Sequence, residues 1–185
     1  MDVHTAIETR RATRSLDPVE ITAELVRDLA AHAGLAPSCS NNQPWRFVFV
    51  FEPARLEAMK PVFSEGNRWC RAASLVIAVF SRKGDDCVIR DREYHQFDAG
   101  LAAAFLILRA TELGLVAHPI AGFSPKRTRE VLGIPEDFQI VTLVLVGKRA
   151  QRLNPDLSEK QVEAETSRPE RLPLERFVFL NGYGG

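Results

Sequence analysis

Three runs of apolar, β-branched and aromatic residues constrain the fold more than any other feature of this sequence. They lie at residues 45–51 (WRFVFVF), 73–80 (ASLVIAVF) and 138–147 (FQIVTLVLVG). Such runs are typical of β-strands, and a run without polar alternation is typical of a strand buried on both faces. The sequence therefore predicts a sheet inside the molecule, in either an α/β or an α+β arrangement.

Helical patterns lie between these runs. Apolar residues at spacings of three and four, with Ser or Thr before them and Gly after them, predict the helices and their ends. Helices are expected at about residues 3–11, 22–33, 52–60, 92–113, 125–132 and 158–165. Residues 118–123 are interpreted as a strand that runs into a loop, and residues 171–180 (RLPLERFVFL) as a further strand. Neither a repeat nor a linker interrupts the chain, so one domain is expected over residues 1–185.

Charge and hydropathy exclude several classes of partner. Lys and Arg number 24, as do Asp and Glu, so the formal net charge is zero. Nucleic-acid binding proteins usually carry an excess of basic residues, so we expect no nucleic-acid partner. The longest apolar stretch is far shorter than the roughly 20 residues that span a bilayer. The N-terminus also lacks the pattern of a secretory signal, so a cytoplasmic protein without a membrane partner is expected.

The cysteines and histidines suggest neither a disulfide framework nor a metal site. Cys39, Cys70 and Cys87 are odd in number and form no C-x-x-C pair. This pattern argues against disulfides, structural zinc and a thioredoxin-like centre, and free thiols are expected. The four histidines are scattered along the chain without ligand spacing, so no metal is expected.

An arginine cluster follows the first helix. Arg10, Arg11 and Arg14 lie in the segment ETRRATR. Arginines usually lie solvated on the surface, and cations are favoured near a helix C-terminus, so surface charge is one interpretation. The other interpretation is an anion site, since guanidinium groups bind phosphate through paired N–H donors.

Two more polar segments stand out. The loop at residues 36–45 (APSCSNNQPW) is denser in Ser, Asn and Gln than a turn requires, although an ordinary turn remains an alternative. The segment at residues 118–123 (HPIAGF) contains Gly122, which permits close backbone approach to a ligand. A plain strand-to-helix connection is the alternative there.

Taken together and in this order, these segments resemble the FMN-dependent nitroreductase family. RRATR followed by PSCSNNQPW is similar to the opening of that family. Its later segments are matched by EGNRW, GLAAAF, HPIAGF, GIPEDF, LVLVGK and RLPLERF, so the resemblance spans nearly the whole chain. It implies an α+β fold with a mostly antiparallel central sheet of four or five strands, flanked by helices. It also implies a homodimer of the domain-swapped type, with residues 100–104 at the interface and the C-terminal strand joining the partner's sheet.

The resemblance implies a phosphate end of an FMN site. Arg10 would bind the phosphate with help from Arg171, and Arg11 and Ala12 would line the phosphate and ribityl chain. Arg14 would lie near the N1/C2=O edge of the flavin ring, where a cation stabilises reduced flavin. Ala12 stands where the family often has serine.

The resemblance also implies contacts with the flavin ring. Asn67 would hydrogen-bond its pyrimidine edge. The loop residues would reach the ring from the other subunit, and the HPIAGF residues would pass close to N5. These two sets are Pro37, Ser38, Cys39 and Asn41, and Pro119, Ile120, Ala121 and Gly122. Ala121 stands where some members carry glutamate.

The implied activity is reduction of nitroaromatics, quinones or related electron-poor small molecules by NADH or NADPH, through FMN and with ping-pong kinetics. The flavin carries the chemistry, so no protein side chain is expected to be catalytic. Three alternatives keep the fold and change the reaction: reductive dehalogenation, enone reduction and flavin turnover. A fourth is a flavin-binding redox sensor without efficient catalysis.

Overall fold

A computed structural model gives the fold and describes residues 1–184. Its centre is β7 (Gln139–Arg149), which pairs with β3 (Leu75–Ser81) along one edge. β7 pairs with β6 (Val116–Ile120) along its other edge and with β1 (Leu16–Asp17) near its C-terminal end, while β2 (Arg46–Val50) pairs with the far side of β3. Within the described residues this sheet has five strands, and every pairing is antiparallel. The predicted α+β fold is confirmed.

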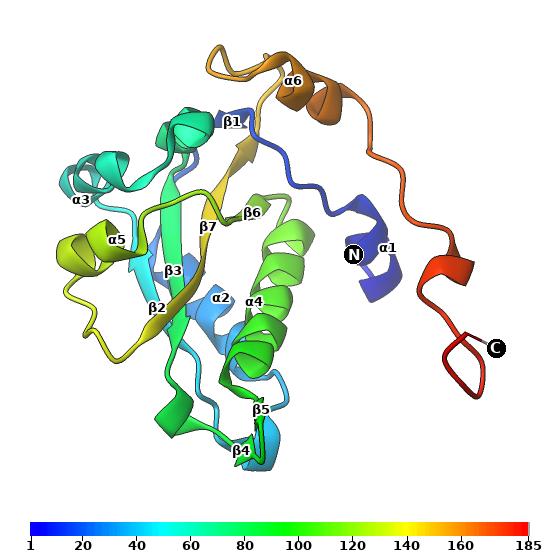
Figure 1. Cartoon of the computed structure of the whole chain (residues 1–185). Coiled ribbons are helices and arrows are strands. Elements are labelled where there is room, and N and C mark those ends of the chain that lie inside the picture. Colours follow the sequence, from blue (N-terminus) through cyan, green and yellow to red (C-terminus); the bar gives the residue numbers. More distant parts are fainter. Residues whose placement is uncertain (185) are drawn as a thin grey trace.

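Helices cover both faces of the sheet, as Figure 1 shows. One face packs against α2 (Ala23–Gly34) and the long α4 (His95–Glu112), which contribute Leu29 and Leu106 to the core. The other face packs against α3 (Pro53–Met59), α5 (Pro125–Leu132) and the 3₁₀ turns between α3 and β3. Every residue of β3 is buried, which explains why its sequence shows no polar alternation.

The predicted helix starts are confirmed by side-chain caps. Each cap accepts a hydrogen bond from a backbone N–H three residues on, which satisfies a group that the helix leaves unpaired. The capping residues of α1 (Val3–Thr9), α2, α5 and α6 (Glu159–Thr166) are Asp2, Thr22, Ser124 and Ser158. Gly133 ends α5 in the left-handed region, where a side chain would be strained.

Three details differ from the sequence-based expectation. Residues 171–180 do not form a strand but pass through a 3₁₀ turn at Leu174–Arg176, since no strand within residues 1–184 pairs with them. A small hairpin of β4 (Val88–Ile89) and β5 (Arg92–Glu93) precedes α4, which therefore starts later than expected.

In the part of the chain that the structure describes, none of the helices has the length and apolarity needed to cross a membrane.

Candidate functional site

Arginines from the two ends of the chain surround a cavity of about 170 Å³. Arg10, Arg11 and Arg14 come from the extended segment after α1, and Arg168 and Arg171 come from the segment after α6. These segments are more than 150 residues apart in sequence, and Figure 1 shows them side by side. Ala12, Ala164 and Pro169 complete the lining.

The positive charge of this cavity is not neutralised. Among residues 1–184, no carboxylate lies within 4.0 Å of a guanidinium nitrogen of these five arginines. Burial lowers the pKa of Arg10 from its ordinary value, and the charges of Arg171 and Arg168 lower it further. Cations held together without a counter-ion attract an anion, and guanidinium groups match the geometry of phosphate.

Backbone contacts fix two of the arginines. Arg11 donates to the carbonyl oxygens of Ala164 at 3.0 Å and Ser167 at 3.1 Å, at the C-terminal end of α6. Arg168 donates in the other direction, to the carbonyls of Glu8 at 2.6 Å and Arg10 at 2.8 Å. Arg11 was predicted to line the phosphate site, and it does line the cavity, but its hydrogen bonds join the two walls.

Glu165 also joins the segment after α1 to α6, but as a hydrogen-bond acceptor. Its buried carboxylate accepts hydrogen bonds from the backbone N–H groups of Arg14 at 2.9 Å and Ser15 at 2.8 Å. This carboxylate is therefore directed at main-chain donors. Arg10, Arg14 and Arg171 donate no side-chain hydrogen bond to any of the residues described, which leaves their donors available.

A stack of side chains links the cavity to the core. The Arg14 guanidinium lies 6.0 Å from the ring centroid of Trp69, whose ring lies 4.7 Å from that of His118. His118 Nδ1 lies 3.0 Å from the carbonyl oxygen of Thr13 and must donate to it. Burial lowers the pKa of His118 to about 4, and the nearby charges of Arg14 and Arg10 lower it as well. His118 is therefore neutral at pH 7 and adds no charge to the arginines.

Asn67 joins this stack to the HPIAGF segment. Its Oδ1 accepts from Trp69 Nε1 at 3.1 Å, and its Nδ2 donates to the carbonyl of Gly122 at 3.0 Å. The same carbonyl accepts from the backbone N–H of Ser64 at 3.1 Å. A Cβ added to Gly122 would overlap Asn67 Nδ2 and lie 2.7 Å from Ser64 Oγ, so close approach requires glycine here.

Side chains of the HPIAGF segment alternate between the two faces of strand β6 and its extension. His118 and Ile120 point into the core, whereas Pro119 and Ala121 are exposed. The structure thus brings together three groups of predicted site residues: the arginines, Asn67 and the residues around Gly122.

The fourth predicted group, the loop at residues 36–45, lies in another part of the folded molecule. Its 3₁₀ turn at Cys39–Asn41 is joined by a disulfide from Cys39 to Cys87, just before β4. Figure 1 shows β4 and α6 at opposite ends of the molecule. One chain therefore does not bring Pro37, Ser38, Cys39 and Asn41 to the arginine cavity.

The disulfide corrects the expectation that all three cysteines are free. The Cα atoms of Cys39 and Cys87 are 6.0 Å apart although 48 positions separate them in sequence, so only the tertiary structure pairs them. Cys70 is free and 1% exposed, and burial raises its pKa to about 12.

Sequence reasoning missed three residues of the site region. Arg168 lies three residues before Arg171, and this local density of arginines was the only sequence feature that could have marked Arg168 as a site residue. Trp69 and Glu165 act through contacts with distant segments, and no local pattern marks them.

Comparison with known proteins gives a consistent result. The model of the Nitroreductase family matches residues 7–68 and 57–148. A Thermus thermophilus protein named NADH dehydrogenase is 26% identical over 209 residues, which cover 96% of this chain and 95% of that protein. Iodotyrosine deiodinase of Haliscomenobacter hydrossis is 28% identical over 187 residues, covering 85% of this chain and 84% of that enzyme. A crystal structure described as that of an oxidoreductase containing FMN has a TM-score of 0.85 at 29% identity, covering 100% of this chain and 93% of that one.

The low pKa of His118 predicts a loss of stability in mild acid. The unfolded histidine takes up a proton near pH 6.5, whereas the folded one resists protonation down to about pH 4. Stability from this group is therefore complete above pH 6.5 and decreases as the pH falls. Between pH 7 and pH 5 the free energy of unfolding should fall by about 2 kcal/mol more in the wild type than in His118→Asn. Urea unfolding at both pH values measures this difference, and equal losses would contradict the buried neutral imidazole.

Close packing at Gly122 predicts that a methyl group disrupts the site. Gly122→Ala should lower the free energy of unfolding by about 1–3 kcal/mol, because Asn67 or the backbone must move. Gly84→Ala is the matched control, since an added Cβ there meets nothing within 4 Å. Thermal unfolding of both variants tests this, and a neutral Gly122→Ala would show that Asn67 is not held in place.

Proposed function

Because the chain belongs to the nitroreductase family, we propose that it is an oxidoreductase that binds FMN and uses NADH or NADPH to reduce electron-poor small molecules such as nitroaromatics or quinones. The related NADH dehydrogenase supports a nicotinamide donor, and the similar oxidoreductase containing FMN supports the cofactor. We further propose that residues 1–185 form one FMN-binding domain.

The observation that carries this proposal is the unneutralised arginine cavity. Its volume of about 170 Å³ suits a phosphate group, and Arg10 and Arg171 have donors available to bind it. Arg11 and Ala12 would line the phosphate and ribityl chain. Arg14, held over Trp69, would place positive charge near the N1/C2=O edge of the ring, where charge develops on reduction.

The residues beyond Arg14 suit the pyrimidine side of a flavin. Asn67 is held by Trp69 and Gly122 and keeps one amide proton for a ligand. The exposed Pro119 and Ala121 would lie along the ring with the backbone of Ile120 and Gly122. Bound FMN would supply the hydride chemistry, with donor and acceptor using one site in turn, so the kinetics would be ping-pong.

A homodimer would complete this site. The loop carrying Pro37, Ser38, Cys39 and Asn41 is far from the arginine cavity of its own chain, so it would reach the flavin held by a second copy. The exposed face of α4 suits such an interface, since Phe97 and Phe105 are 62% and 40% exposed. A neighbouring apolar cavity of about 310 Å³, between α1, α2 and α4, extends this surface. Apolar surface of this extent usually marks an interaction site.

The C-terminal segment supports the same assembly. Its large apolar side chains are exposed, among them Leu172, Phe177 and Leu180. At the other side of the molecule, β2 is an edge strand, flanked by a groove of about 230 Å³ along Val48–Phe51. We propose that this segment of one subunit pairs with the sheet edge of its partner, which would give residues 171–180 the strand partner that they lack in a single chain.

Dehalogenation is the second candidate reaction. The iodotyrosine deiodinase of Haliscomenobacter hydrossis is 28% identical over 85% of this chain, so a halogenated aromatic is the alternative acceptor class for the same site. Product analysis after anaerobic incubation with nitro, quinone and halogenated compounds distinguishes the candidates.

The decisive test is the visible absorbance of the purified protein before and after anaerobic addition of NADH or NADPH. The proposal predicts a flavin band that bleaches on reduction. A band that does not bleach would favour a flavin-binding sensor, and a protein that cannot be reconstituted with FMN would refute the proposal.

The division of roles among the arginines predicts different mutant phenotypes. Arg10→Ala should raise the Kd for FMN about 10- to 100-fold, because a charge-assisted hydrogen bond is lost. Arg11→Ala should mainly lower thermal stability, since Arg11 binds backbone carbonyls. Arg152→Ala, at an exposed position away from the arginine cavity, is the control for fluorescence titration with FMN. Equal affinities for wild type and Arg10→Ala would contradict the phosphate site.

The proposed interface predicts that charge on α4 separates the subunits. Phe105→Asp should convert a dimer into a monomer, because burying an unpaired carboxylate costs several kcal/mol. Leu153→Asp is the control, since Leu153 is similarly exposed, at 47%, in the segment between β7 and α6. Sedimentation at micromolar concentration gives the result, and a dimeric Phe105→Asp variant would contradict this interface.

A further inference from the structure

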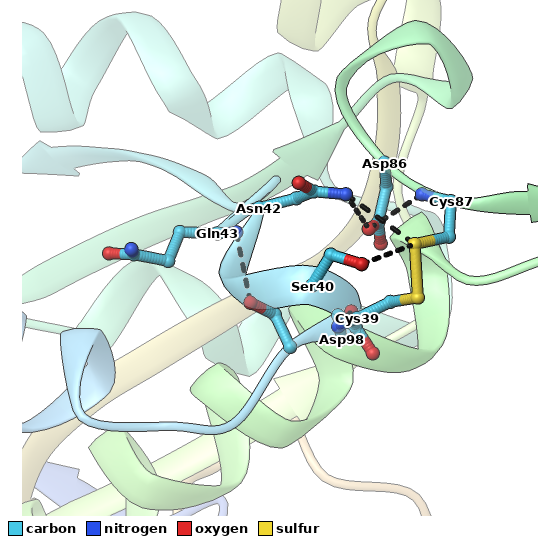
Figure 2. The surroundings of a disulfide bond; sticks show 8 residues. Cys39, Ser40, Asn42, Gln43, Asp86, Cys87 and Asp98 are labelled. Atoms are coloured by element: carbon cyan, nitrogen blue, oxygen red, sulfur yellow. Dashed lines mark hydrogen bonds between the residues drawn. A yellow bond between two sulfur atoms is a disulfide. The ribbon is translucent and has the colours of Figure 1, made fainter.

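The Cys39–Cys87 disulfide is a covalent link between two segments that otherwise meet through polar contacts. Asn42 Nδ2 donates to Asp86 Oδ1 at 3.2 Å, and Arg46 pairs with Asp85 at 3.2 Å. Cys39 lies in the loop between α2 and β2, and Cys87 lies between β3 and the β4–β5 hairpin. Figure 2 shows Asn42 and Ser40 beside the sulfur of Cys87. Both cysteines are half-buried, so the bond is accessible to small molecules, in contrast to the fully buried Cys70.

The loop that carries Cys39 has an unfavourable backbone conformation at three residues. Ser40, Asn41 and Gln43 have φ values of 50°, 58° and 51°, in the left-handed region that side chains disfavour. Such residues persist only where surrounding contacts over-determine the conformation. The contacts here include the disulfide, the hydrogen bond from Cys39 N to Asp98 Oδ2 at 2.7 Å and that from Gln43 N to Ser38 Oγ at 3.0 Å.

The surroundings of the two sulfurs are asymmetric. Asn42 Nδ2 and Ser40 Oγ lie 3.5 Å and 3.7 Å from Cys87 Sγ, and both must donate because a disulfide sulfur has no proton. A carboxylate oxygen of Asp86 lies within 4.8 Å of both sulfurs. Asp86 Oδ2 is buried and has no hydrogen-bond partner among residues 1–184. Two donors at Cys87 favour it as the sulfur that departs with negative charge.

Two carboxyl groups lie behind the disulfide. Asp98 is buried, and its burial raises its pKa, as does the nearby carboxyl of Asp86, while the bond from Cys39 N opposes the rise. Reduction would break the covalent link between the loop at residues 36–44 and the segment that carries Cys87.

We propose that Cys39–Cys87 is a thiol-exchange site, at which low-molecular-weight thiols or dithiols reduce the disulfide and release the loop at residues 36–44. A thiolate attacks Cys39 Sγ, the S–S bond breaks, and Cys87 Sγ leaves with the electron pair and takes a proton. A second thiol then attacks the mixed disulfide, which yields a Cys39 thiol and an oxidised thiol pair. The protein gains two electrons and two protons, and two thiols lose them.

Its consequence for the active site rests on the proposed function. In the proposed dimer, the loop contacts the FMN of the partner subunit through Pro37, Ser38, Cys39 and Asn41. If the released loop holds its bound conformation about a tenth of the time, the apparent Kd for FMN rises about tenfold. The disulfide thereby couples flavin binding to the thiol redox state.

The experiment compares the oxidised dimer with the same protein after incubation with glutathione or dithiothreitol. Alkylation under denaturing conditions, followed by mass spectrometry, should count one thiol in the oxidised form and three after reduction. Hydrogen exchange of residues 36–44 should then accelerate, and the Kd for FMN should rise about tenfold. Cys39→Ser and Cys87→Ser should resemble the reduced form with or without thiol, whereas Cys70→Ser should respond as the wild type does.

The outcomes separate this proposal from the proposed function. Three thiols in air-oxidised protein, a disulfide that thiols reduce only after unfolding, or unchanged hydrogen exchange in the loop would each overturn the thiol-exchange site. Faster exchange with an unchanged FMN Kd would overturn its coupling to the flavin. Faster exchange in a protein that binds no FMN in either form would support the thiol-exchange site and refute the proposed function instead.

Discussion

Hydrogen bonding along both edges of β7 is the constraint on which the rest of the structure depends. β3 pairs with one edge and β6 with the other, so the apolar residues Leu143–Val146 are completely buried. Helices must then cover both faces of the sheet, because neither face can remain exposed to water. The same pairing fixes β6, whose end carries Gly122, and β1, which follows the arginine segment. The position of the candidate site is thus a consequence of how the sheet is assembled.

Electrostatic imbalance at the arginine cavity is maintained by backbone groups. Arg11 and Arg168 bind carbonyl oxygens, which hold the guanidinium groups without neutralising them. Glu165, the carboxylate at the same junction, accepts from backbone N–H groups of Arg14 and Ser15. The neutral His118 behind Trp69 adds no further repulsion. The result is a rigid site with surplus positive charge, which is the property that an anionic cofactor requires.

Opposite ends of the folded subunit carry complementary parts of a proposed flavin site. The arginines, Asn67 and Gly122 form one part, and the cross-linked loop around Cys39 forms the other. The exposed apolar faces of α4 and of the C-terminal segment offer the means to join two copies. In such an assembly the disulfide would stabilise a loop of one subunit that acts on a cofactor held mainly by the other, so that redox chemistry at the loop would be transmitted across the interface.

The sequence by itself determined the elements that depend on local interactions. The buried runs became β2, β3 and β7, and Thr22 and Ser124 cap helices as expected, because a cap needs only a neighbour three residues away. The order of the motifs also indicated the family and the arginines of the site. Only the tertiary structure decided that Cys39 pairs with Cys87, that Arg11 binds α6 whereas Arg10 keeps its donors, and that residues 171–180 remain unpaired in a single chain. Each of these depends on segments that are distant in sequence and meet only after the sheet has formed, so no local pattern could contain them.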